Sequence, residues 1–281
     1  MENMTDFIAE YGARREEWQT WGMFFALLGL FLSAMAIIGF FYFTVRFKDR
    51  RVLLITLLAM ASFWHAFTYA LIFTGFIRAV PEWYNKGIGL YYLIAPCAYF
   101  FTLFSLFPRL KWPRYAWLHL LPFVFGIMDA IPYAMASIEE KTALLEQIVH
   151  NMKMGVQHEY GYIDQQWHYI AKFSMAFIYV IAQWRLVYLH DMEFSSVSFA
   201  VRRNVVYFSL VYSGQLLLQG GMVVSLLSNS MQSSFLMQNM DQLTTISFLY
   251  LILSCWLLQH MFRLGMRVDE TSAMVYEKMN A

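Results

Sequence analysis

Residues 21–51 read WGMFFALLGLFLSAMAIIGFFYFTVRFKDRR, an apolar run of about 25 residues followed by a basic turn. At about 1.5 Å per residue, a helix of this length crosses a hydrocarbon core of about 30 Å. The turn contains Arg46, Lys48, Arg50 and Arg51. Because Lys and Arg concentrate in the cytoplasmic connections of membrane proteins, this stretch predicts a transmembrane helix that ends at the cytoplasm.

The same pattern repeats along the chain and predicts an all-α polytopic membrane protein with seven transmembrane helices. We expect the spans at 21–45, 52–77, 87–107, 115–135, 167–189, 204–228 and 242–262. Of the 20 Lys and Arg residues, 13 gather around every second connection: Arg46, Lys48, Arg50, Arg51, Arg109, Lys111, Arg114, Arg185, Arg202, Arg203, Arg263, Arg267 and Lys278. This bias predicts an N-terminus outside and a C-terminus in the cytoplasm.

The composition indicates the same class. Hydrophobic residues make up 59% of the chain and charged residues 14%, against roughly a quarter charged in soluble domains. The lipid bilayer is therefore the first expected partner. The net charge of +1 and the scattered basic residues give no basis for direct nucleic-acid binding.

The apolar runs also define the expected domain organisation. We expect an outer polar tail at 1–19, a transmembrane domain at 20–262 and a short cytoplasmic tail at 263–281. One long outer loop, 136–166, interrupts the domain. Its stretch 138–153 has apolar residues at helical spacing, which predicts a short amphipathic helix over the bundle. Prolines within the third and fourth spans predict that these helices bend.

Charged residues inside a bilayer require a partner or a role. Asp129 in the fourth span and Lys172 in the fifth lie in the outer half at comparable predicted depth. We expect an ion pair between them. Two interpretations are open: a buried pair that fixes helix packing, and a pair that contacts a ligand at the base of an outer cavity.

Four further polar residues in the spans are candidate binding residues. His65 lies mid-membrane and His119 near the inner end of the fourth span, and each is expected to hydrogen-bond to a neighbouring helix. Gln215 and Gln219 are four residues apart and so share one helix face. They could bond between helices or contact a substrate in a central cavity. His158, Asp164 and His168, near the end of the outer loop, could approach one another, and a metal site there is a minor alternative.

Several classes of chemistry lack the residues they need. The chain has no His-x-x-x-His or Cys/His spacing typical of a metal site, and no Gly-x-Ser-x-Gly nucleophile motif. The seventh span contains no lysine, which excludes a retinal protein. We therefore expect no metal, no cofactor and no enzymatic activity.

Two stretches resemble the seven-helix membrane sensor domain of bacterial AraC-type transcription regulators. In that family an Ala-Pro step precedes an aromatic run, a basic turn and a His-x-x-Pro-Phe motif. Residues 91–133 contain these features at Ala95–Pro96, at 99–101 and at His119 to Phe123, and residues 169–190 resemble the fifth helix of the family. The resemblance implies a sensor bundle in a bacterial inner membrane. The family continues into a DNA-binding domain that this sequence lacks, so we expect output through a protein partner.

These observations predict a non-enzymatic membrane sensor or scaffold that detects an outer ligand or holds a partner complex. Asp129, Lys172 and the 136–166 loop would form its outer site. A homo-oligomer is compatible with this hypothesis. The alternative is a transporter or channel subunit in which Gln183, Gln215 and Gln219 line a polar path.

Overall fold

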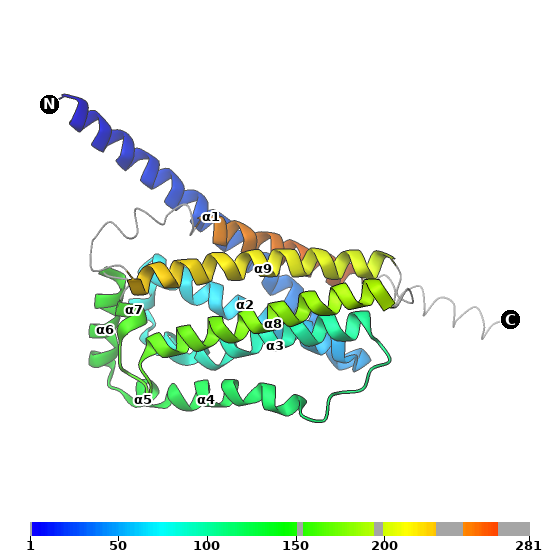
Figure 1. The fold of residues 1–281 in the computed structure, drawn as a ribbon. Helices are drawn as coiled ribbons and strands as arrows, with labels where there is room; N and C mark the ends of the chain where they lie inside the picture. The colour runs from blue at the N-terminus through cyan, green and yellow to red at the C-terminus, as the bar shows by residue number, and fades with distance from the viewer. Residues whose placement is uncertain (1, 151–153, 194–198, 229–243, 264–281) are drawn as a thin grey trace.

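The structure is a computed structural model of the chain that describes residues 2–150, 154–193, 199–228 and 244–263. Within these ranges every regular element is a helix (Figure 1). The long helices are α1 (Glu2–Phe47), α2 (Arg50–Phe73), α3 (Ile88–Leu106), α8 (Gln165–Glu193), α9 (Phe199–Ser228) and a final helix at 244–263. The shorter elements are η1 (Phe76–Ala79), η2 (Pro81–Trp83), η3 (Asn85–Gly87), η4 (Ala116–Leu120), α4 (Leu121–Asp129), α5 (Ile131–Met135), α6 (Ile138–His150) and α7 (Met154–Gln157).

Six segments of the described chain are long and apolar enough to cross a membrane: Trp21–Phe47, Arg50–Ile72, Pro81–Leu106, Ala116–Met135, Gln165–His190 and Thr244–Arg263. The prediction of an all-α protein with membrane-spanning helices is confirmed at this level. Helix α9 is 30 residues long but lies outside this set, and Gln215 and Gln219 make its sequence more polar. A seventh crossing and the orientation of the termini stay predictions.

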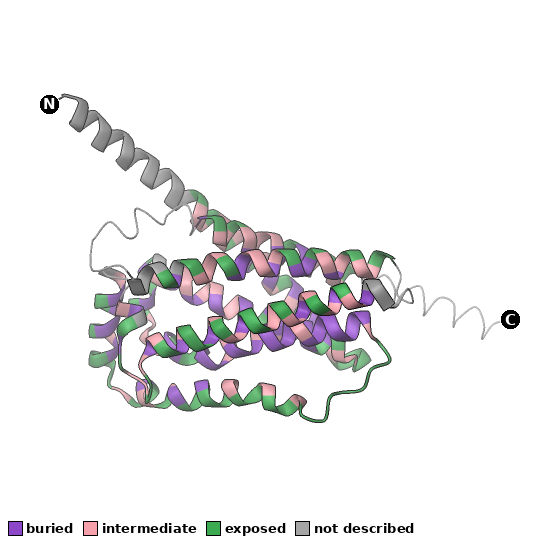
Figure 2. Cartoon of the chain, in the orientation of Figure 1, coloured by how far each residue is buried: buried purple, intermediate pink, exposed green. Residues whose placement is uncertain are grey.

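Helix α3 is the centre of the bundle, and 15 of its 19 residues are buried (Figure 2). It packs against α2, α4, α8 and α9. A helix that is apolar on all sides must be covered on all sides. At its inner half, the ring of Phe101 meets those of Phe208 and Trp256 at centroid distances of 5.4 and 6.0 Å, which joins α3 to α9 and the final helix.

The fourth predicted span is divided into η4, α4 and α5, as its prolines indicate. Pro122 and Pro132 lie in the first turn of α4 and of α5, where a missing backbone N–H costs no helical hydrogen bond. Helix α3 contains Pro96 and remains one helix. The prolines therefore divide the fourth span into short segments, and α4 follows the side of the bundle (Figure 1).

Helix α6 covers one end of the bundle, which confirms the predicted amphipathic helix over its first 13 residues (Figure 1). It begins in a capping box, because the Ser137 hydroxyl accepts from the Glu140 N–H and the Glu140 carboxylate accepts from the Ser137 N–H. Its apolar face joins a cluster from α2, η1 and α5, together with Tyr84 between η2 and η3. Residues 151–153, also predicted in this helix, lie outside the described residues.

An ion pair between a buried lysine and a partly exposed glutamate fastens α6 to the bundle. The Lys141 side chain is only 2% exposed, and its Nζ donates to the Glu82 carboxylate at 2.8 Å and to the Ala134 carbonyl at 3.1 Å. These bonds connect α6 to η2 and to the end of α5. The outer loop is therefore a packed cap over this end of the molecule.

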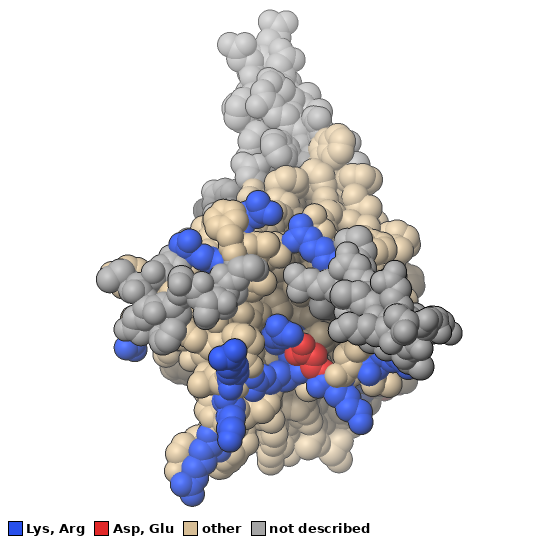
Figure 3. Space-filling view, turned by 90° about the vertical axis from the view of Figure 1, so that its right-hand side faces the viewer, with Lys and Arg blue, Asp and Glu red and all other residues tan. Residues whose placement is uncertain are grey.

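The opposite end of the bundle carries the basic turns (Figure 3). Asp49 caps the N-terminus of α2 and pairs with Arg51 at 2.6 Å. The neighbouring Arg50 donates to the Pro108 carbonyl at 2.8 Å and lies 3.8 Å above the Phe104 ring. The first and second basic turns of the sequence therefore contact each other at the end of the bundle far from α6.

Two glycines allow α4 to approach α3 closely, and this contact can be tested. A Cβ added to Gly126 would lie 2.8 Å from the Gly89 Cα, which is backbone and cannot rotate away. We expect Gly126→Ala to destabilise the folded protein by about 1–3 kcal/mol, seen as a lower midpoint of thermal unfolding in detergent.

Gly221→Ala is the matched control, because a Cβ there has no neighbour within 4 Å and alanine favours a helix over glycine by about 1 kcal/mol. Equal midpoints for the two variants would contradict the close contact between α3 and α4.

Candidate functional site

The half of the bundle nearer α6 contains two polar clusters where the sequence suggested one. The predicted ion pair between Asp129 and Lys172 is wrong: Asp129 contacts His168, and Lys172 contacts His65. His168 and Lys172 are one turn apart on α8, a separation of about 6 Å along the helix axis. Asp129 ends α4 at the level of His168, so the carboxylate meets the histidine and the lysine lies one turn deeper.

Asp129 holds the outer loop against the bundle. Its side chain is 4% exposed, with Oδ2 at 2.9 Å from His168 Nε2, and Oδ1 accepts from the Ile163 N–H at 2.9 Å. A Cβ at Gly161 would lie within 2.1 Å of Oδ2, so the loop can pass here only because that residue is glycine. One carboxylate thus joins α4, α8 and the loop before α8.

Two histidines complete this first cluster, each held by a tyrosine. The Tyr92 hydroxyl lies 2.8 Å from His168 Nδ1, which fixes the imidazole between α3 and Asp129. The Tyr84 hydroxyl lies 3.0 Å from His158 Nε2, which ties the loop to the segment before α3. Every polar group named here has a partner within the protein. The cluster is therefore best explained as a clamp on the outer loop.

The second cluster surrounds Lys172. This side chain is 9% exposed, and its Nζ lies 3.3 Å from His65 Nε2. Three aromatic rings face the ammonium, with centroids at 4.9 Å for Tyr91, 5.1 Å for Tyr169 and 4.7 Å for Phe173. Among the described residues, no carboxylate lies within ion-pair distance of Lys172.

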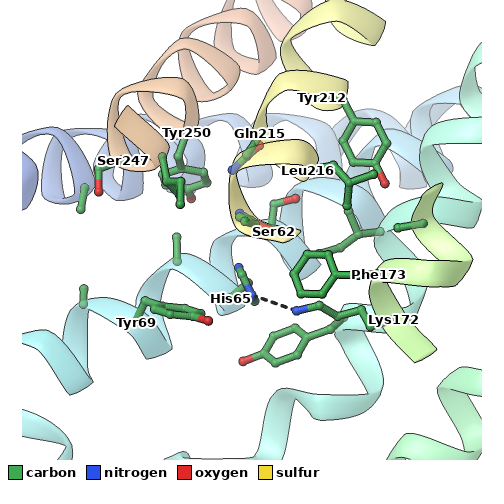
Figure 4. A pocket seen from close by; sticks show the side chains of 18 of the residues that line it. Ser62, His65, Tyr69, Lys172, Phe173, Tyr212, Gln215, Leu216, Ser247 and Tyr250 are labelled. Atoms are coloured by element: carbon green, nitrogen blue, oxygen red, sulfur yellow. Dashed lines mark hydrogen bonds between the residues drawn. The ribbon is translucent and has the colours of Figure 1, made fainter. Parts of the chain in front are cut away.

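Lys172 and His65 border a cavity of about 130 Å³ in the same half of the bundle (Figure 4). Helices α1, α2, α3, α8, α9 and the final helix all contribute to its wall. The wall is mainly aromatic and aliphatic, with Tyr69, Tyr91, Phe173, Tyr212, Tyr250, Ala95, Ala176 and Leu216 among its residues. Few polar groups in an apolar enclosure are typical of a small-molecule site.

Gln215 and Gln219 both line this cavity, which places them together on one wall as their spacing predicts. Neither amide has a hydrogen-bond partner among the described residues, so the structure favours the cavity interpretation over bonding between helices. Gln183 does not line the cavity. Its Nε2 donates to the Ser209 hydroxyl at 2.6 Å and joins α8 to α9, so the three glutamines do not form one polar path.

The two candidate histidines have separate environments. His65 lines the cavity. His119, in η4, hydrogen-bonds to the Tyr179 hydroxyl of α8 and packs its ring edge-on against Phe100 at 5.0 Å. This confirms the predicted bond between helices for His119 and removes it from the candidate binding residues.

The sequence analysis missed the partners of the candidate residues. His168 was noticed only as a neighbour of His158, and the tyrosines Tyr91 and Tyr92 were not singled out. The spacing of His168 and Lys172 places both on one face of α8, which is the signal that could have linked them. The aromatic neighbours could not be selected, because 19% of the chain is aromatic.

Comparison with known proteins adds no assignment: no family model, no curated protein and no solved structure matches this chain. The resemblance to the membrane domain of AraC-type regulators therefore stays a prediction.

The loop clamp predicts a pH dependence at His158. Burial lowers the pKa of this imidazole from 6.5 to about 4. Below pH 6.5 an opened loop binds a proton that the closed loop excludes, so closure is fully stable above pH 6.5 and weakens as the pH falls toward 4. The free energy that stabilises loop closure falls by at most about 3 kcal/mol over this range. We expect the amides at 154–163 to be less protected from hydrogen exchange at pH 5 than at neutral pH, after correction for the pH dependence of exchange in an unfolded chain.

His158→Gln isolates this effect, because the variant keeps Asp129 and His168. We expect the pH dependence of loop exchange to flatten in the variant while the pH dependence elsewhere is unchanged. The same slope in the variant and the original protein would contradict the assignment.

Proposed function

We propose that this protein is a non-enzymatic membrane sensor that binds a small, mainly apolar ligand in the cavity beside Lys172. The observation that carries the proposal is a partly open cavity lined by Gln215 and Gln219, whose amides have no hydrogen-bond partner among the described residues. Protein interiors are packed with few voids larger than a water molecule. A cavity of about 130 Å³ is similar in size to an engineered cavity of about 150 Å³ that binds benzene.

The position of the cavity supports a sensing role. Six helices line the cavity, so a bound ligand would contact several helices at once. A ligand that binds one arrangement of these helices better than another shifts the population toward that arrangement. The same helices continue to the basic end of the bundle. The proposal places the response there, where a protein partner or a second copy of the chain would receive it.

The orientation in the proposal comes from the basic turns. Lys and Arg mark the cytoplasmic side, so the cavity and the α6 cap would face outward. We propose a bacterial inner membrane on the basis of the family resemblance. Binding without turnover is expected because His65 contacts Lys172 at 3.3 Å, and neither of the cavity serines Ser62 and Ser247 is paired with His65 as a nucleophile with its base.

Transport is the second candidate, because Gln215 and Gln219 line the same cavity. A transporter must expose its site to each side of the membrane in turn. The two candidates therefore differ in the faces from which the cavity can be reached.

Cysteine labelling distinguishes these functions. Ser62 lines the cavity, and the free thiols at Cys97 and Cys255 can be replaced by serine to give a cysteine-free background. We expect Ser62→Cys in this background to react with an anionic, membrane-impermeant methanethiosulfonate from the outer face only. Reaction is measured by mass shift in intact cells and in inverted vesicles.

Three control variants define the result. Ala143→Cys on α6 reports the cap face, Lys111→Cys reports the basic face, and Ser254→Cys, which is fully buried outside the cavity, should not react from either. Labelling of Ser62→Cys from both faces would favour transport. Labelling of Ser62→Cys from the basic face alone, or from neither face, would contradict the proposed sensor. Labelling of Lys111→Cys from outside would contradict the proposed orientation.

A further inference from the structure

Lys172 has a buried amino group with unused hydrogen-bonding capacity. An ammonium group has three N–H donors. Its one polar neighbour among the described residues is His65 Nε2 at 3.3 Å, while Tyr91, Tyr169 and Phe173 present ring faces. The remaining donors border the cavity, and Figure 4 shows the side chain directed toward His65 at its edge.

No acidic side chain of the described chain compensates this charge. Asp129 is occupied by His168 and the Ile163 N–H, and Glu82 by Lys141. Burying a charge without a counter-charge is unfavourable by several kcal/mol or more. The contrast with Lys141 is informative, because that equally buried lysine has both a carboxylate and a carbonyl partner.

We infer that the cavity binds a monocarboxylate whose carboxylate group contacts Lys172 and His65. This inference rests on the proposed function and specifies the ligand class. The carboxylate would accept charge-assisted hydrogen bonds from the free ammonium donors. It would also supply the counter-charge that the described side chains of this region do not provide.

Other headgroups fit the cavity less well. A cationic ligand would be repelled, because the Lys172 ammonium already occupies the aromatic faces that a ligand cation would use. A phosphate monoester carries up to two charges and several acceptor oxygens, and the described cavity wall offers one cationic side chain. A singly charged carboxylate matches this one lysine.

The walls specify the remainder of the ligand. Away from Lys172 the cavity is lined by Ala176, Leu216, Tyr212 and Tyr250, which favour an aromatic or branched apolar body. In Figure 4 Gln215 and Tyr250 lie across the cavity from the Lys172–His65 pair, where the amide can bond a second polar group. The volume of about 130 Å³ suits a body the size of one aromatic ring.

Phenylacetate is a suitable probe, because it combines a carboxylate with one aromatic ring. Its matched analogues are phenylacetamide, which is neutral, and phenethylamine, which is cationic. With the full chain in lipid nanodiscs, we expect phenylacetate to raise the midpoint of thermal unfolding in a saturable manner. The amide should bind roughly tenfold or more weakly, since a hydrogen bond to a charged group is lost. The amine should give no shift.

Lys172→Met should abolish the shift by phenylacetate. Lys141→Met is the matched control: it removes an equally buried lysine from the cap, and it should lower the basal midpoint while the shift by phenylacetate is retained. If Lys172→Met does not fold, Ala176→Phe provides the second variant, because it fills the cavity and leaves the lysine in place. That variant should also lose the shift.

The outcomes separate this inference from the proposed function. Four results would each overturn the carboxylate site. Two concern the analogues: equal shifts with phenylacetate and phenylacetamide, or a shift with phenethylamine. The other two are an unchanged response in Lys172→Met and the absence of any response to phenylacetate. The sensor proposal would stand in these cases if Ser62→Cys is labelled from the outer face alone. Failure of the labelling result would instead overturn the proposed function itself.

Discussion

The structure depends on one constraint: a polar group inside an apolar helix bundle needs a partner. Asp129 satisfies it through His168 and a backbone N–H, Lys141 through Glu82, and Gln183 through Ser209. Each of these contacts joins two elements that are distant in sequence, so the buried polar groups also determine which helices meet. The cavity is one place where the described residues do not meet this rule from within: there Lys172, Gln215 and Gln219 keep bonding capacity. Asn85 and Thr102 are smaller exceptions elsewhere, each with one buried polar atom that has no hydrogen-bond partner among the described residues.

The two polar clusters in the half of the bundle nearer α6 differ in whether their polar groups are satisfied within the protein. The cluster around Asp129 is closed, because carboxylate, imidazoles and tyrosine hydroxyls pair with one another and hold the loop in place. The cluster around Lys172 is open, because aromatic faces stabilise the ammonium without supplying a counter-charge. One turn of α8 separates them. A stable cap beside an open site is the arrangement that a ligand-binding membrane protein requires.

The same separation explains how a ligand could affect the opposite end of the bundle. Helix α3 is buried along its length and contacts α2, α8 and α9, so these helices cannot move independently of it. The ring stack of Phe101, Phe208 and Trp256 links α3 to α9 and the final helix below the cavity. Under the proposed function, these ring contacts are one place where a change in helix positions at Lys172 could be passed toward the basic turns.

The sequence determined the all-α class, the membrane-spanning character, the amphipathic helix α6 and the division of the fourth span at its prolines. These features follow from local properties: the length of apolar runs, helical spacing and the missing N–H of proline. It also identified Asp129, Lys172, Gln215 and Gln219 as residues that need a role. The tertiary structure decided how these residues pair, and it replaced the expected contact between Asp129 and Lys172 with two separate clusters. Which side chains pair depends on the relative depth of their helices. One helical turn, about 6 Å, is enough to separate two side chains beyond the reach of an ion pair. The same distance lies within the uncertainty of a span boundary that is read from sequence, so the sequence could not decide the pairing.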